Sequence, residues 1–71
     1  MNENLMKEIV EGLVEAADEI AAKDDKDLFE SGQLIAYAEA LSIIRDAHAG
    51  YDLAKIGLDF DIDAKYLTRL K

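Results

Sequence analysis

Hydrophobic residues recur along residues 3–23 at the spacing of one helical face. At about 100° per residue, the apolar side chains fall on one half of the helical wheel and the charged side chains on the other. The apolar half consists of Leu5, Met6, Ile9, Val10, Leu13, Val14, Ala16, Ala17, Ile20 and Ala21. This pattern predicts an amphipathic helix. Because the apolar half is wide, we expect the helix to contact at least two other elements.

A second helical pattern covers about residues 26–49, after the charged stretch Lys23–Asp27, which we interpret as a hairpin turn. Asp24, Asp25 or Asp27 can cap the helix, and Gly32 in its first two turns leaves a later start with Ser31 as the cap, or a kink, as the alternatives. Gly50 stands where a left-handed residue would end it. We predict an apolar face that consists of Phe29, Ala36, Tyr37, Ala40, Leu41, Ile43, Ile44 and Ala47, with Leu34 and His48 at one edge.

A weaker seam follows another side of this second helix. Leu28, Ile35, Ser42 and Ala49 repeat every seven residues there. We expect this seam to be covered either by the C-terminal segment or by a second copy of the chain. In the second case, Leu28 and Ile35 would be homodimer contacts.

The C-terminal residues 51–71 divide into short pieces. Asp52 can cap a single turn that Gly57 ends. Residues 58–63 then alternate apolar and acidic side chains, which is typical of a half-buried strand, but a lone strand has no pairing partner. We therefore predict an extended connector whose apolar residues point into the hairpin, followed by a last short helix that Asp61 or Asp63 caps.

These elements together predict a single all-α domain over residues 1–71. The short turn favours an antiparallel helical hairpin of about residues 3–23 and 26–49. A C-terminal segment of one or two short helices packs across it. The expected core positions are Ile9, Leu13, Ile20, Tyr37, Leu41, Ile44 and Phe60.

Composition excludes several classes of function. The chain has 71 residues, no cysteine and one histidine, so it lacks a thiolate nucleophile and a paired-histidine metal site. A net charge of −8 has the wrong sign for direct nucleic-acid binding. No apolar run approaches the roughly 20 residues of a membrane span. We expect a cytoplasmic protein without a membrane partner and without cofactors.

The negative charge is concentrated at the N-terminal end. Residues 1–30 hold ten acidic and three basic residues, which accounts for −7 of the net −8. We select a candidate interaction surface for a basic protein, namely Glu8, Glu11, Glu15, Asp18 and Glu19. The alternative is a solvated face that only keeps the protein in solution.

Three motifs suggest chemistry without completing it. Residues 59–63 match the start of a calcium loop, but Ala64 replaces its glycine and Leu70 its bidentate glutamate. His48 suits the last turn of a helix. Ser31 resembles the modified serine of acyl carrier proteins, although its neighbours differ from the Asp and Leu of that motif. We assign no catalytic or metal-binding residues.

A longer stretch resembles a known group of proteins. The resemblance lies mainly within residues 31–63, in the segments 31–41, 43–44, 50–53 and 56–61. These segments are similar to short acidic proteins of Gram-positive bacteria, often carried on phage-derived or mobile DNA. The resemblance implies a bacterial cytosolic origin and no particular activity. From the residues themselves we expect a non-enzymatic protein-interaction module with a basic partner or itself as partner, regulatory in role, with an acyl-carrier-like protein modified on Ser31 as the alternative.

Overall fold

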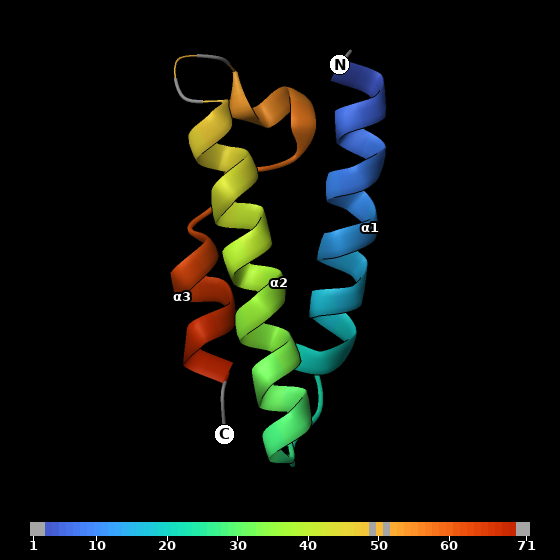
Figure 1. The fold of residues 1–71 in the computed structure, drawn as a ribbon, viewed down its shortest axis with the longest axis vertical. Coiled ribbons are helices and arrows are strands. Elements are labelled where there is room, and N and C mark those ends of the chain that lie inside the picture. The colour runs from blue at the N-terminus through green and yellow to red at the C-terminus, as the bar shows by residue number, and fades with distance from the viewer. Residues whose placement is uncertain (1–2, 49, 51, 70–71) are drawn as a thin grey trace.

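The computed structural model describes residues 3–48, 50 and 52–69, and it confirms the helical hairpin with a C-terminal segment packed across it. The long helices α1 (Glu3–Ala21) and α2 (Leu28–Ala47) run side by side in opposite directions (Figure 1). The 3-10 helix η1 (Leu53–Ile56), the short helix α3 (Ile62–Tyr66) and the 3-10 helix η2 (Leu67–Arg69) follow. The long helices differ from their expected bounds by about two residues, and Ala49, the predicted end of the second, lies outside the described residues.

The capping residue of α2 is Asp27 rather than Ser31. Asp27 Oδ1 accepts a hydrogen bond from the Glu30 backbone N–H at 2.7 Å, and Glu30 Oε1 accepts one from the Asp27 N–H at 3.2 Å. This reciprocal capping box satisfies two backbone donors that the start of a helix leaves without partners. The later start at Ser31 is therefore wrong, and Gly32 lies inside the helix.

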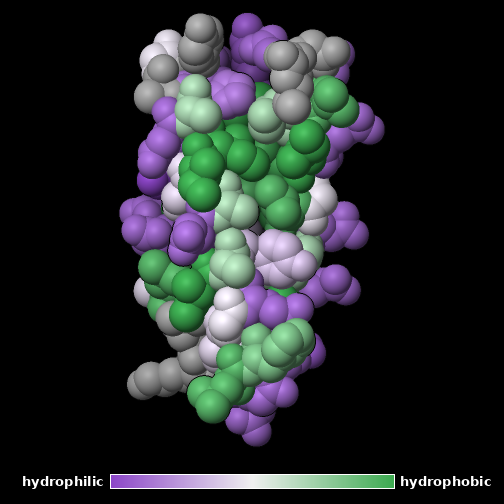
Figure 2. Space-filling model, in the orientation of Figure 1, coloured by the Kyte–Doolittle hydropathy of each residue, from purple (hydrophilic) through white to green (hydrophobic). Residues whose placement is uncertain are grey.

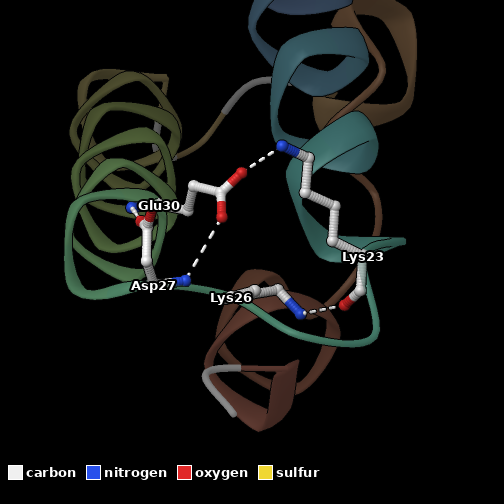
Figure 3. A network of polar contacts seen from close by, with 4 residues as sticks. All are labelled: Lys23, Lys26, Asp27 and Glu30. Carbon is white, nitrogen blue, oxygen red and sulfur yellow. Dashed lines mark hydrogen bonds and ion pairs between the residues drawn. The ribbon is translucent and has the colours of Figure 1, made fainter.

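A small polar network fixes the hairpin turn next to this cap (Figure 3). Lys23 Nζ donates to the Glu30 carboxylate, and Lys26 Nζ donates to the Lys23 carbonyl oxygen at 2.8 Å. The hydrogen bond from Lys23 lowers the pKa of Glu30, assisted by the hydrogen bond from the Asp27 backbone, and the same bond raises the pKa of Lys23. The turn that follows α1 is thus joined to the first turn of α2 through one carboxylate.

The C-terminal pieces begin and end largely where the sequence predicts. Asp52 Oδ1 accepts from the Ala54 N–H at 3.1 Å, and Gly57 ends η1 in a left-handed conformation with φ 83°. Asp61 caps α3 by accepting from the Ala64 N–H at 3.1 Å. The connector between Gly57 and Asp61 forms no strand. Its apolar alternation instead directs Leu58 into the core, where that residue is buried.

The core lies where α1, α2 and the C-terminal segment meet. Its buried residues come from all three parts of the chain and comprise Val10, Ala17, Leu34, Ala38, Leu41, Ile56, Leu58, Ile62 and Tyr66. Of the predicted core, Leu41 is fully buried. Five others are partly buried and pack against this core, namely Leu13, Ile20, Tyr37, Ile44 and Phe60. The prediction for Ile9 is wrong, because its side chain is 39% exposed.

The predicted apolar face of α2 is also partly wrong. Leu34, Ala38 and Leu41 are the buried residues of this helix, whereas Phe29 is 72% exposed and Ile43 is 62% exposed. The reason is that α2 carries apolar side chains around most of its circumference, so its own pattern does not select one side. The C-terminal segment packs beside Ala38. The buried side of α2 therefore includes Ala38 and faces away from Phe29 and Ile43.

Substitutions at neighbouring positions of α2 test which side of the helix is buried. We expect Leu41→Ala to lower the free energy of unfolding by about 2–5 kcal/mol, because it empties fully buried space. Ile43→Ala should change it by no more than about 0.5 kcal/mol, because that side chain is mostly in solvent. Urea unfolding followed by circular dichroism measures both values. Equal losses in the free energy of unfolding at the two positions would contradict this assignment of the buried side.

Candidate functional site

The predicted acidic surface lies along α1, and its residues are exposed. Glu8, Glu11, Glu15 and Glu19 recur at spacings of three and four residues, which places them along one side of the helix. Asp18 belongs to the same side but has a structural partner. Its Oδ1 accepts a hydrogen bond from the Tyr66 hydroxyl at 2.8 Å. The glutamates are therefore the part of this surface that is best placed to meet a partner.

Tyr66 joins the last helix to α1. Its side chain is fully buried, and Lys65 Nζ lies 3.2 Å from the same Asp18 oxygen. Phe60 packs edge-on against the Tyr66 ring with 6.2 Å between ring centroids, and Lys65 Nζ lies 4.7 Å from the Phe60 centroid. Burial raises the pKa of Tyr66, and the hydrogen bond to Asp18 raises it further. This cluster holds the C-terminal segment against the hairpin.

A shallow hollow separates α1 from the chain around Gly57. Its volume is about 320 Å³, and it is lined by Val10, Glu11, Val14, Glu15, Asp18 and Gly57. Valine side chains form its apolar part and carboxylates surround them. Long basic side chains have a matching character, with an aliphatic stem and a cationic end.

A second surface is apolar and was not predicted as a functional site. Among the described residues, the two long helices expose six large hydrophobic side chains, and four of these lie on one face of the hairpin, with exposed fractions of 46% for Leu5, 39% for Ile9, 72% for Phe29 and 62% for Ile43. Together with the exposed Ala36 and Ala47 they define what we call the open face. Figure 2 shows hydrophobic side chains gathered in the upper half of this face and again at its lower end, with paler and hydrophilic residues between them and hydrophilic residues on both sides. The predicted amphipathic stripes contained all six residues, but the sequence indicated burial for them.

The predicted second seam of α2 is divided. Ile35 is 44% exposed and borders a hollow of about 230 Å³ with Ser42 of α2 and Asp63 and Leu67 of the C-terminal segment. Leu28, at the start of the helix, is 93% exposed. The C-terminal segment thus approaches the middle of the seam and does not cover its first residue.

The remaining candidate residues lie in ordinary helical positions. Ser31 is half-buried in the early part of α2, and its backbone N–H donates to the Asp27 carbonyl oxygen at 3.0 Å. His48 caps the end of α2, with Nδ1 3.3 Å from the Ile44 carbonyl oxygen. Within residues 3–48, 50 and 52–69, no group of three His, Cys, Asp or Glu side chains is placed to hold a metal ion. Among the same residues, no helix combines the length and apolar character that spanning a membrane requires.

Comparisons with protein families, curated proteins and solved structures find no match to this chain. The surfaces described above therefore have to be interpreted from their own chemistry.

The buried Tyr66 generates a pH-dependent prediction. Because its pKa is raised in the folded state, the folded protein holds the neutral phenol, and this contribution is complete below the unfolded pKa of about 10. Stability should fall as the pH rises above about 10, where the unfolded state releases the proton more readily. Chemical unfolding at several alkaline pH values measures this slope.

Two tyrosine variants separate Tyr66 from the general effect of alkali. Tyr66→Phe should lower the stability near pH 7 by about 1–3 kcal/mol, because the hydrogen bond to a charged group is lost. It should also flatten the alkaline slope. Tyr37→Phe leaves the Tyr66 contact in place and should keep that slope. A slope that survives Tyr66→Phe would contradict the assignment.

Proposed function

We propose that this protein is a non-enzymatic interaction module that binds another protein through its helical hairpin. The open face is the observation that carries the proposal. Leu5 and Ile9 of α1 and Phe29 and Ile43 of α2 expose large apolar side chains on one molecule of only 71 residues. Large apolar side chains that are exposed together on one face mark an interaction site more often than scattered single residues do.

The charge of α1 supports a basic partner. Glu8, Glu11, Glu15 and Glu19 are exposed, and they lie on an element that holds much of the net charge of −8. Such a surface accelerates association with a positively charged protein and disfavours acidic ones. We include a regulatory role in the cytoplasm of a bacterium in this proposal, on the resemblance of residues 31–63 to short acidic bacterial proteins.

The acyl-carrier alternative gains no support from the position of Ser31. The serine lies inside α2 beyond the Asp27 cap, and it is half-buried. Intact mass after incubation with a phosphopantetheinyl transferase tests this alternative directly. Addition of the prosthetic group to the protein and its loss in Ser31→Ala would support a carrier.

Affinity capture with charge variants tests the interaction module. We expect the chain to retain a protein partner from cells that produce it, and we expect Glu8, Glu11, Glu15 and Glu19 changed together to Gln to reduce that retention at least about tenfold. Asp18 is left unchanged because it binds Tyr66. Quantitative mass spectrometry of the retained proteins measures the difference.

A matched variant removes four charges elsewhere. Asp24, Asp25, Asp59 and Asp63 are exposed, and changing them to Asn alters the net charge by the same amount. This variant should retain the partner. Equal retention by both variants would contradict the role of α1, and the absence of any partner of the unmodified chain would contradict the module itself.

A further inference from the structure

The C-terminal segment covers only one side of the hairpin. On α1 it lies beside the row that contains Val10, Val14 and Asp18. On α2 it lies beside Ala38 and Ser42. The C-terminal segment therefore covers the side chains between α1 and α2 from one side of the hairpin. Solvent contacts them from the other side.

The open face occupies the uncovered side. On α1, Leu5 and Ile9 are about half a turn of the wheel away from Val14, beyond the residues that contact α2. On α2, Phe29 and Ile43 are similarly displaced from Ala38. Because the helices are antiparallel, the start of α1 and the end of α2 lie at the same end of the hairpin, where Figure 1 shows η1 between them. Leu5, Ile9 and Ile43 therefore gather at one end of the face.

The middle of the open face is formed by small residues. Gly12 and Ala16 continue the row of Leu5 and Ile9 along α1, and Ala36 continues the row of Ile43 along α2. A Cβ built at Gly12 would meet no described heavy atom within 4 Å apart from its chain neighbours and the backbone of its own helix. Along these two rows, small side chains thus separate the larger ones at the two ends of the face.

Acidic side chains border this face on both sides. Glu8 follows Leu5 by three positions, and Glu19 follows Ala16 by three, so both lie at the outer edge of α1. Glu39 and Asp46 lie four positions before and three after Ile43, at the outer edge of α2. All four are exposed, and Arg45 pairs with Asp46 at 3.3 Å.

These borders distinguish between a second copy and a different partner. In a symmetric dimer through the open face, acidic borders of one copy would meet acidic borders of the other, between chains that each carry −8. Like charges placed opposite each other oppose association. A partner whose apolar stripe is flanked by Lys or Arg matches both the apolar open face and its acidic borders.

We propose that the open face binds one amphipathic helix of another protein, with its apolar side chains between α1 and α2 and its basic flanks against Glu8, Glu19, Glu39 and Asp46. This inference rests on the proposed interaction module and specifies the chemistry of its partner. Burial of the apolar stripe supplies most of the affinity, and the charges select the partner and its orientation.

Titration of the full chain with designed peptides tests the proposal. One peptide of about 18 residues, or five helical turns, carries a leucine stripe with Lys on both flanks. A second has the same stripe with Glu flanks, and a third is a scrambled form of the first. We expect the first peptide to bind at least about tenfold more tightly than the other two, with NMR shift changes at Leu5, Ile9 and Ile43.

Variants of the protein locate the binding surface. Phe29→Gln and Ile43→Gln should each weaken the binding of the first peptide about tenfold, because each removes an exposed apolar side chain and leaves the buried core unchanged. Leu67→Gln removes a side chain that is 40% exposed on the C-terminal segment and should leave the affinity unchanged. Equal binding of all three peptides, or affinity that survives both open-face variants, would overturn the proposal.

Light scattering on the free protein tests whether a second copy of the chain occupies the open face instead. A dimer that Ile43→Gln dissociates would assign the open face to a second copy and overturn the proposal. A monomer that binds the Lys-flanked peptide supports it. A third outcome is that a cellular partner is captured through Glu8, Glu11, Glu15 and Glu19 while none of the peptides binds. This outcome would refute the amphipathic helix as the occupant of the open face but would still support the interaction module.

Discussion

The packing of the C-terminal segment against one side of the hairpin determines most of what is specific about this molecule. Ile62 and Tyr66 are fully buried, and the Tyr66 hydroxyl reaches Asp18 across 48 residues of sequence. A chain this short buries a modest fraction of its surface, so a third element that completes the core is needed for stability. The aromatic ring supplies apolar area, and its hydroxyl is satisfied by a carboxylate.

The same packing creates the two surfaces of functional interest. By taking one side of α2, the segment leaves Phe29 and Ile43 in solvent, and by taking one side of α1, it leaves Leu5 and Ile9 exposed. The acidic residues stay outside the core because ionised carboxylates are costly to bury. An apolar face between acidic borders results from an ordinary amphipathic hairpin whose third element covers only half of it.

Asp18 shows that one position can serve stability while its neighbours remain available for binding. Glu15 and Glu19 lie within four residues of it on the same helix, and both are exposed. Asp18 is instead fixed between the Tyr66 hydroxyl and Lys65 Nζ. Helical periodicity places all three on one side of α1, but only the position of α3 brings Tyr66 and Lys65 to Asp18.

The sequence by itself determined the local structure. Helical periodicity and aspartates at the helix starts predict the elements and their order, because caps and amphipathic spacing act between residues that are near in the chain. The structure then decides which aspartate caps each helix where the sequence left alternatives, namely Asp27 for α2 and Asp61 for α3. Only the tertiary structure decided which side of α2 is buried, and with it the open face. That choice could not be derived locally, because α2 is apolar on several sides and the contacts that select one come from Leu58, Ile62 and Tyr66, far along the chain.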